Sequence, residues 1–295
     1  MNSNASAPGT CPTGVAVPRR ASFACMGINH YENFPVGSWL LPSRLRAPVA
    51  QIYRFARYAD DIADEGDAPV DQRLAALAAL RVDLDRMEAG TYPPDGRWSE
   101  LAVTARAHAL PLEWLRDLLR AFEQDVRGAS YRDYEELLAY CRYSANPVGR
   151  LLLALYQRPE QQLAEWSDSI CTGLQLVNFW QDIDRDYAKG RVYVPQSEFA
   201  RFGVTAAQIA QRRPNEAWKQ MMAAQTQTAR RFLLSGQPLA RALGGRVGWE
   251  LRLIIQGGLR IAERIDTVDG DVFYRRPVLR ATDWIQMFAR AALTK

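Results

Sequence analysis

Histidine and paired cysteines are scarce in this chain of 295 residues, and their scarcity excludes several kinds of site. Only His30 and His108 are present, which excludes a multi-histidine metal centre and argues against histidine acid–base chemistry. The four cysteines, at positions 11, 25, 141 and 171, form no Cys-x-x-Cys pair, so zinc ribbons, iron–sulfur clusters and thioredoxin-type chemistry have no support. We therefore expect reduced thiols in a cytoplasmic protein.

Long apolar runs, targeting patterns and a strong net charge are also absent. No segment approaches the roughly 20 apolar residues of a membrane-spanning helix. Residues 1–25 lack the continuous apolar stretch of a signal peptide, and we expect a disordered tail there, ahead of one domain over 26–295. A formal charge of +4 is too mild to indicate a nucleic-acid partner. We expect at most a peripheral contact with the inner face of a membrane.

Helix-favouring residues dominate from Ser43 onward, and the alternation typical of strands is hard to find. Proline and glycine clusters divide the chain into segments that predict helices over 46–65, 70–89, 98–109, 111–127, 133–156, 160–188, 205–212, 214–234, 237–243, 248–265 and 281–292. Neither a strand followed by Gly-x-Gly-x-x-Gly nor a Gly-x-x-x-x-Gly-Lys-Ser/Thr loop is present. The sequence therefore predicts an all-α domain that lacks the standard glycine loops for phosphate.

The first predicted helix carries a polar stripe. At about 100° per residue, four side chains fall within an arc of about 60° over three turns. They are Tyr53, Arg57, Asp60 and Asp64. Phe55 and Ile62 lie on the opposite side, so one face is expected to pack and the other to present a tyrosine, an arginine and two carboxylates.

The predicted helix over 160–188 carries a comparable stripe of two amides and two carboxylates. Its members are Gln175, Asn178, Asp182 and Asp186. Their neighbours are Leu, Val, Phe and Trp, while Asp184 points about 180° away from the stripe.

A solvated charged face is the plainer interpretation of one such pattern, because Asp pairs are common on protein surfaces. Carboxylates at i and i+4 lie about 6 Å apart, however, and their repulsion costs on the order of 3 kcal/mol per pair at an effective dielectric of about 20. A divalent cation removes this repulsion, and Mg²⁺ combines one or two carboxylates with phosphate oxygens. Two facing stripes therefore predict a Mg²⁺ cluster around a diphosphate, with Arg57 as a further anion contact.

These residues resemble the squalene/phytoene synthase family. The family pattern Tyr-x-x-x-Arg-x-x-Asp-x-x-x-Asp matches the first stripe, and Gln-x-x-Asn-x-x-x-Asp-x-x-x-Asp matches the second. The segments 140–149 and 190–195 also fit, and the resemblance extends over roughly residues 28 to 290. It implies a single-domain isoprenoid synthase fold, an all-α helical bundle with a central cavity, whose Mg²⁺ cluster bridges the diphosphate of a prenyl substrate.

Within the family, the segments 30–36 and 60–67 look most like the hydroxysqualene synthase branch of bacterial hopanoid biosynthesis. That likeness implies an enzyme that ionises presqualene diphosphate, releases diphosphate and traps the rearranged cation with water. No NADPH is expected. Release of a lipid product is the reason to expect the peripheral membrane contact.

The resemblance also implies roles for individual residues. Catalytic roles fall to Tyr53, Arg57 and Tyr140; substrate binding to Asn33, Phe34, Arg57, Gln175, Asn178 and Tyr193; and metal binding to Asp60, Asp64, Asn178, Asp182 and Asp186. The aromatic face of Tyr140 would stabilise a carbocation, although a core tyrosine is the plainer interpretation. Arg275 and Arg276 either close over the diphosphate or form a solvated basic end.

Two departures from the family pattern affect these assignments. Many relatives have Ser-x-Ser-Phe where this chain has Tyr-Glu-Asn-Phe at 31–34, so Asn33 would replace a serine contact to the diphosphate. The bend after Tyr143 is usually Val-Ala-Gly, but here it is Ser-Ala-Asn-Pro at 144–147. The residue before proline avoids the α region, so the helix should break there. We add Asn146 to the catalytic residues as the group that orients the nucleophilic water; the plainer alternative is that it caps a kink.

Other functions stay open at this point. The same site would serve the condensation of two prenyl diphosphates, such as farnesyl diphosphate, to presqualene diphosphate, squalene or phytoene. A relative that had lost catalysis and become an assembly factor would be expected to lose the acidic residues that this chain keeps. A class I terpene cyclase would share Asp-Asp-x-x-Asp at 60–64, but the spacing over 178–186 does not fit its usual Asn/Ser/Glu triad.

Overall fold

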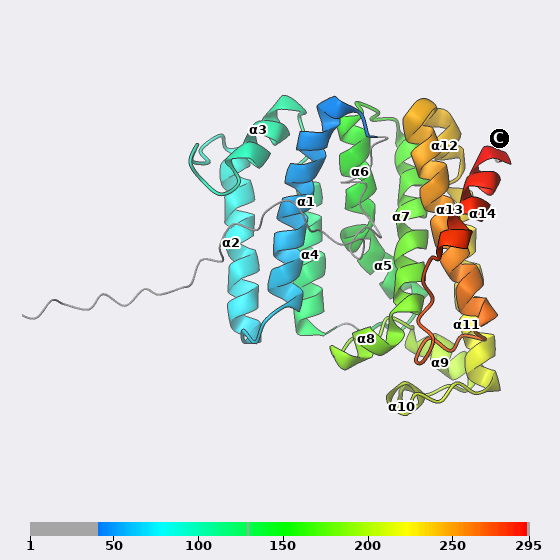
Figure 1. Ribbon diagram of the computed structural model, residues 1–295. Coiled ribbons are helices and arrows are strands. Elements are labelled where there is room, and N and C mark those ends of the chain that lie inside the picture. Colours follow the sequence, from blue (N-terminus) through cyan, green and yellow to red (C-terminus); the bar gives the residue numbers. More distant parts are fainter. Residues whose placement is uncertain (1–40, 129, 294–295) are drawn as a thin grey trace, which may run out of the picture.

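The computed structural model describes residues 41–128 and 130–293, so the predicted tail over 1–25 and the predicted substrate contacts Asn33 and Phe34 lie outside the described residues. Within these two ranges the chain forms α-helices and no strand, with one isolated parallel bridge between Ser130 and Val192. Most of the long helices run side by side along a common direction (Figure 1). The predicted all-α class is confirmed.

One part of the bundle is formed mainly by helices from the first half of the chain. These are α1 (Ser43–Asp64), α2 (Val70–Glu88), α3 (Ser99–Ala107), α4 (Glu113–Arg127) and α6 (Asn146–Leu155). Their apolar side chains form one buried cluster, to which α1 contributes Ile52 and Phe55 with no exposed surface. Because Phe55 faces this cluster, the opposite side of α1 turns away from it, as the periodicity predicted.

A second buried cluster lies around the remaining long helices. These are α5 (Tyr134–Ser144), α7 (Gln161–Gln181), α11 (Glu216–Ser235) and α13 (Gly245–Thr267). The shorter elements are α8 (Ile183–Ala188), α9 (Gln196–Phe202), α10 (Ala206–Ala210), α12 (Pro238–Leu243) and α14 (Ala281–Leu293). At Gly173 of α7 a Cβ would lie 2.8 Å from the backbone nitrogen of Leu233, so the close approach of α7 and α11 requires glycine there.

Two long predicted helices are each divided in the structure. The segment predicted as 133–156 is divided at Ala145 into α5 and α6, next to the Asn-Pro step where a break was expected. Asn146, the residue before the proline, already belongs to α6, so the expected departure of that residue from the α region is not seen. The segment predicted as 160–188 ends as α7 at Gln181 and resumes as α8 at Ile183. The backbone N–H of Asp182 still donates to Asn178 at 3.0 Å, and that of Asp186 to Asp182 at 2.9 Å, so the stripe keeps its helical register through the break. Helix α9 was not predicted, because its seven residues between Pro195 and Gly203 are too short for a clear periodicity.

An apolar pocket that is open to solvent lies between α6, α7, α12 and α13, with a cavity volume of about 90 Å³. Val148 and Leu152 of α6 line it, as do Ile170 and Leu174 of α7. None of the described helices is long and apolar enough to cross a membrane.

Candidate active site

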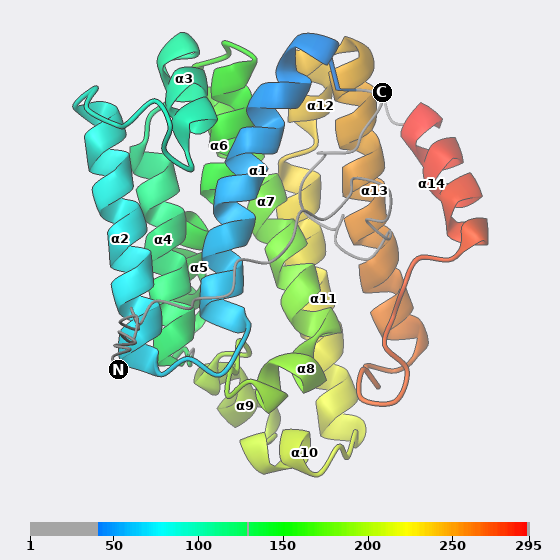
Figure 2. The ribbon, with the colours of Figure 1, turned by 60° about the vertical axis from the view of Figure 1, so that its left-hand side comes forward.

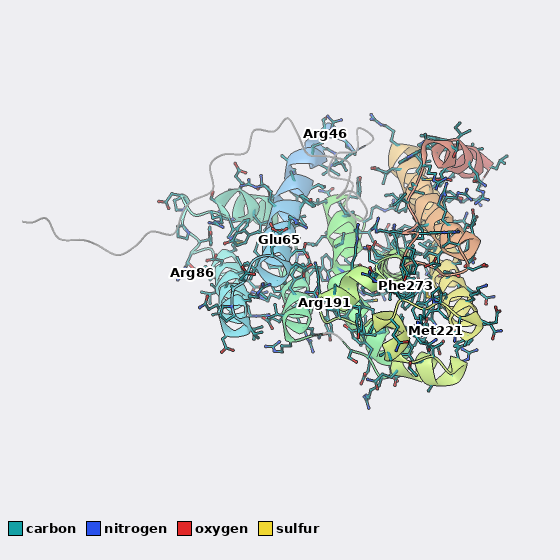
Figure 3. The ribbon with its side chains drawn as sticks, turned by 60° about the horizontal axis from the view of Figure 1, so that its bottom comes forward. Arg46, Glu65, Arg86, Arg191, Met221 and Phe273 are labelled. Carbon is teal, nitrogen blue, oxygen red and sulfur yellow. The ribbon has the colours of Figure 1, made fainter. Side chains whose placement is uncertain are left out.

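The two predicted acidic stripes converge at one end of the bundle, at the seam between the two apolar clusters. The link is the loop after α8, from which Lys189 Nζ lies 2.6 Å from Asp64 Oδ2 and Arg191 Nη2 lies 2.5 Å from Asp64 Oδ1. Seen from this end, Arg191 lies beside the end of α7, on the side that faces α1 (Figure 3). Asp64 on α1 and the α7–α8 junction are therefore parts of one site.

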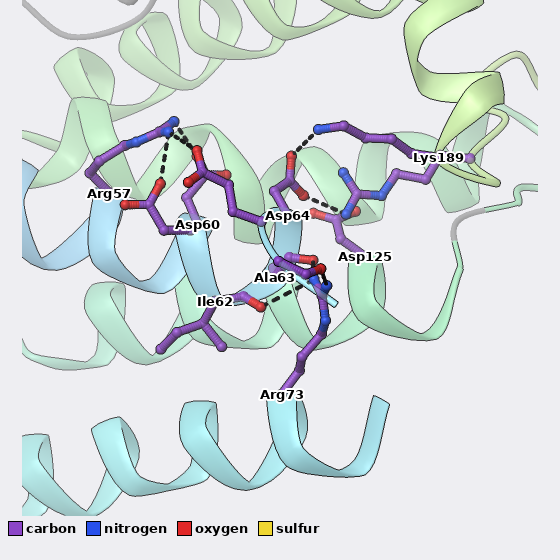
Figure 4. A network of polar contacts seen from close by, with 12 residues as sticks. Arg57, Asp60, Ile62, Ala63, Asp64, Arg73, Asp125 and Lys189 are labelled. Carbon is purple, nitrogen blue, oxygen red and sulfur yellow. Dashed lines mark hydrogen bonds and ion pairs between the residues drawn. The ribbon is translucent and has the colours of Figure 1, made fainter. Parts of the chain in front are cut away.

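The α1 side of the site holds a cation among several carboxylates (Figure 4). Arg57 lies 2.8 Å from Asp60, 2.7 Å from Asp61 and 2.8 Å from Glu65. Burial, and next the charge of Asp64, raise the pKa of Asp60 to about 6. A raised pKa is expected for carboxylates that repel one another without a bound cation.

The pKa values of Asp64 and Asp60, which lie one turn apart, are shifted in opposite directions. Burial alone would raise the pKa of Asp64, but the hydrogen bonds from Arg191 and Lys189 outweigh it and lower the pKa. Arg73 of α2 fixes this end of α1, because its guanidinium donates to the carbonyl of Ala63 at 2.6 Å and to that of Ile62 at 3.3 Å (Figure 4). A cation at the end of a helix also suits its negative pole. Sequence reasoning missed Arg73, which positions Asp64.

The α7–α8 side contains one paired and one unpaired carboxylate. Arg276 holds Asp182 with two hydrogen bonds, of 2.7 Å and 2.9 Å. Of the two interpretations of Arg276, this contact favours the one in which its segment closes over the site. Gln181 fixes the same segment by donating a hydrogen bond to the carbonyl of Pro277 at 2.5 Å. The Asp186 carboxylate accepts no hydrogen bond from residues 41–128 or 130–293. Burial, and next the charge of Asp182, raise its pKa to about 7.

Asp184, on the same short helix, confirms the predicted direction of the stripe. It points away from the site and forms a two-bond ion pair with Arg212, at 2.8 Å and 3.0 Å. The predicted stripe residues Gln175 and Asn178 are partly buried on α7. Gln175 lies about two turns before Asp182, and Asn178 lies about one turn before it.

Asp125 of α4 is a site residue that sequence reasoning missed. It accepts hydrogen bonds from the hydroxyl of Tyr140, at 2.9 Å and 2.8 Å to its two oxygens, and from the hydroxyl of Tyr193 at 3.0 Å. Burial raises its pKa to about 6, and its charge acts on both Asp60 and Asp186. A signal was available, because a carboxylate in the last turn of a helix is opposed by the helix dipole and needs another reason to be there.

Aromatic rings separate these carboxylates from the apolar core. Tyr193 stacks on Phe179 with ring centroids 3.8 Å apart and an angle of 8° between the planes. Tyr140 lies 5.8 Å from Tyr193 and 5.5 Å from Tyr131. All four rings are buried, and burial raises the pKa of Tyr140 and Tyr193 well above the ordinary tyrosine value. These hydroxyls therefore stay protonated and act as donors to Asp125.

The other predicted catalytic residues lie further from this centre. Tyr53 is partly buried on α1, one turn before Arg57. Asn146 lies at the start of α6, 5% exposed, and its Oδ1 accepts a hydrogen bond from the hydroxyl of Thr172 at 3.0 Å. Ser144 Oγ, on the other side of the same break, is buried and has no hydrogen-bond partner among the described residues. The break thus brings two polar side chains into a mainly apolar region.

The predicted Mg²⁺ ligands fit a cation that is completed by substrate oxygens. Asp60, Asp182 and Asp186 are hard oxygen donors, and the unpaired Asp186 carboxylate lies among like charges, which a divalent cation would relieve. In the described part of the chain, no three acidic, histidine or cysteine side chains are grouped closely enough to hold a metal ion by themselves. Phosphate oxygens would therefore have to supply the missing ligands.

The all-α bundle with facing acidic helices defines a class of prenyl-diphosphate-processing folds, and sequence comparison identifies the family. The model for "Squalene/phytoene synthase" matches residues 29–283, and the chain belongs to this family of enzymes. The fold agrees: the crystal structure of squalene synthase HpnC from Alicyclobacillus acidocaldarius superposes with a TM-score of 0.75 at 36% identity, over 81% of this chain and 90% of that one.

Two curated relatives differ in their reactions. The hydroxysqualene synthase of Rhodopseudomonas palustris is 33% identical over 242 residues, which cover 81% of this chain and 80% of that protein. The presqualene diphosphate synthase of the same organism is 34% identical over 185 residues, which cover 62% of this chain and 65% of that protein. The similarity to the hydroxysqualene synthase is thus as strong and extends over more of both chains.

Proposed function

We propose that this enzyme ionises presqualene diphosphate in a Mg²⁺-dependent reaction, rearranges the cation and captures it with water, giving hydroxysqualene and diphosphate. The observation that carries the proposal is the convergence of Asp60, Asp64, Asp125 and Asp186 with Lys189 and Arg191 at the end of an apolar bundle. Such a site suits a small polyanion attached to a long apolar chain.

The cations around the site would bind the leaving group. Arg57, Lys189, Arg191 and Arg276 now neutralise aspartates, and a diphosphate with Mg²⁺ would offer them a stronger anion. Asp60, Asp64, Asp182 and Asp186, with Asn178, would hold the metal. The metal, when bound, supplies positive charge that stabilises the departing diphosphate.

The aromatic groups would protect the carbocation from bulk water. The rings of Tyr140, Phe179 and Tyr193 lie between the carboxylates and the core, and an aromatic face stabilises a cation without reacting as a strong base. The hydrogen bonds to Asp125 fix the orientation of Tyr140 and Tyr193. The apolar pocket lined by Ile170 and Leu174 of α7 would receive part of the hydrocarbon chain.

Water capture requires one held water in a pocket that otherwise excludes water. Ser144 Oγ has no hydrogen-bond partner within residues 41–128 and 130–293, and Asn146 lies two residues further on, at the break between α5 and α6. These groups support the hypothesis that the break orients the nucleophile. The Asn146→Gly variant, supplied with presqualene diphosphate, should form less alcohol relative to proton-loss products. An unchanged product ratio at an unchanged rate would leave Asn146 a structural residue.

Head-to-head condensation is the competing reaction, and the similarity to the presqualene diphosphate synthase is the observation in its favour. Separate incubations with presqualene diphosphate and with farnesyl diphosphate, with Mg²⁺ and without NADPH, distinguish the two. Hydroxysqualene formed from presqualene diphosphate, with little consumption of farnesyl diphosphate, supports the proposal. Conversion of farnesyl diphosphate to presqualene diphosphate as the main reaction would replace it.

A further inference from the structure

Helix α14 (Ala281–Leu293) presents its apolar face to the outside. Trp284, Ile285 and Phe288 are 47%, 74% and 46% exposed, and Leu293 is 81% exposed. At about 100° per residue, the exposed positions 281, 282, 284, 285, 288, 289, 292 and 293 cover an arc of about 180°, and all of them except Thr282 are Ala, Ile, Leu, Phe or Trp. A surface helix of a globular protein normally carries charged side chains on this arc.

The charged side chains of α14 point inward instead. Asp283 has no exposed surface and accepts hydrogen bonds from Arg260 at 2.7 Å and Arg264 at 2.8 Å. Arg290 forms an ion pair with Glu263. These contacts fix α14 against the outer side of α13 (Figure 2), so its apolar face is held outward by the fold.

The surroundings of this face are basic. Every carboxylate on α13 and α14 is buried or paired: besides Asp283, Glu250 is 8% exposed, Glu263 pairs with Arg260, and Asp266 pairs with Arg230. Arg252 of α13 and Arg280, just before α14, form no ion pair within the described residues. Arg252 follows Trp249 by three residues, and Trp249 contacts Phe288 with ring centroids 6.5 Å apart. The apolar face is thus flanked by positive charge that no acidic side chain offsets.

We propose that the α14 face, defined by Trp284, Ile285, Phe288 and Leu293, docks onto an anionic lipid surface. Helices with an outward face rich in Trp, Phe and Leu and with neighbouring arginines bind in the interfacial region of bilayers. At 13 residues α14 is about 20 Å long, which is too short to span a bilayer.

A second copy of the chain fits this face less well. A strip about 20 Å by 10 Å offers a few hundred Å², against about 800 Å² per partner in a stable interface, and two such faces would bring like charges together.

The apolar pocket and the proposed membrane face lie on opposite sides of α13. Val247 and Leu251 line the pocket, whereas Trp249, about 160° away from each of them around the helix, contacts Phe288 of α14. Docking of α14 would bring α13, which borders the pocket, near the bilayer. The docking proposal does not depend on which prenyl product the enzyme makes.

Co-sedimentation of the full-length protein with phosphatidylcholine vesicles, with and without phosphatidylglycerol, tests this proposal. Wild type should sediment with the anionic vesicles, and Trp284→Gln/Ile285→Gln should lower the partition coefficient about tenfold or more, given the apolar area withdrawn. Val103→Gln on α3 is the matched control, because Val103 is 64% exposed and lies on another face; it should bind as wild type does. Arg252→Gln/Arg280→Gln should weaken binding to anionic vesicles only. Thermal melts show whether each variant is folded. If Trp284→Gln/Ile285→Gln does not fold, Phe288→Gln replaces it as the variant of the α14 face.

Two results would overturn the proposal. One is wild-type protein that sediments with neither kind of vesicle, or a folded α14 variant that sediments as wild type does. The other is a wild-type dimer, detected by light scattering, that becomes a monomer in Trp284→Gln/Ile285→Gln while vesicle binding stays unchanged. The α14 face would then be the contact with a second copy of the chain.

Discussion

Replacing Asp186 with asparagine should stabilise the metal-free enzyme, although it removes a proposed metal ligand. The Asp186 carboxylate is unpaired within the described residues, and burial followed by the charge of Asp182 raises its pKa from 3.8 to about 7. A carboxyl whose pKa is higher in the folded state than in the unfolded state favours folding while it is protonated. It destabilises the fold progressively as the pH rises from about 4 to about 7.

The size of the effect follows from the shift. Three pKa units correspond to about 4 kcal/mol at neutral pH, which is an upper limit because the side chain is partly exposed and interacts with other carboxylates. After discounting for solvent screening, we expect Asp186→Asn to add about 1–2 kcal/mol near pH 7.5. For a chain of this size that is a rise in Tm of about 2–4 °C.

Thermal melts in EDTA at pH 7.5 and pH 4.5 measure this effect. Asp184→Asn is the matched control, because Asp184 lies on the same helix but is paired with Arg212, so its loss should stabilise nothing. The gap between Asp186→Asn and wild type should narrow at pH 4.5, where the wild-type carboxyl is already protonated in the folded state. An Asp186→Asn variant no more stable than wild type at pH 7.5, or a gap of the same size at both pH values, would refute the reasoning.

Three further predictions follow from the structure. Mg²⁺ together with diphosphate should raise the Tm of wild type well above the effect of either alone, since the carboxylates supply too few ligands for a tight Mg²⁺ site; equal stabilisation by Mg²⁺ alone would contradict this. Tyr193→Phe removes a donor to Asp125 and should lower turnover about tenfold with little change in Tm. Steady-state kinetics measure this, and a turnover number equal to that of wild type would contradict the prediction. Asp283→Asn should cost about 3 kcal/mol, because it leaves Arg260 and Arg264 partly unpaired, and should speed proteolysis within α14; an unchanged denaturation midpoint would count against it.

The long helices and the acidic stripes could be predicted because both depend on local periodicity. The burial of Phe55 and the outward direction of Asp184 follow from helix geometry. The Asn-Pro step marked the approximate place of the break, which falls at Ala145. The family could be recognised because the residue spacing of two long motifs matches its pattern, and two such motifs carry much more information than either one alone.

The contacts between distant segments could not be predicted in the same way. Arg276 pairs with Asp182 across 94 positions and Lys189 with Asp64 across 125, and no local pattern encodes such pairings. From like-charge repulsion alone, Asp60→Ala and Asp182→Ala would each be expected to leave the fold intact or slightly more stable. Because Arg276 holds Asp182, this expectation remains only for Asp60→Ala. Asp125 was missed because a single acidic residue near a helix end gives no periodic signal.

The central claim is that this site ionises a prenyl diphosphate and delivers water to the resulting cation. Turnover of presqualene diphosphate in ¹⁸O-labelled water, with Mg²⁺ and without a reductant, tests it most directly by mass spectrometry of the product. The account predicts hydroxysqualene with one ¹⁸O atom in its hydroxyl group and release of one diphosphate per alcohol formed. A hydrocarbon as the sole product, or an alcohol without the label, would contradict it.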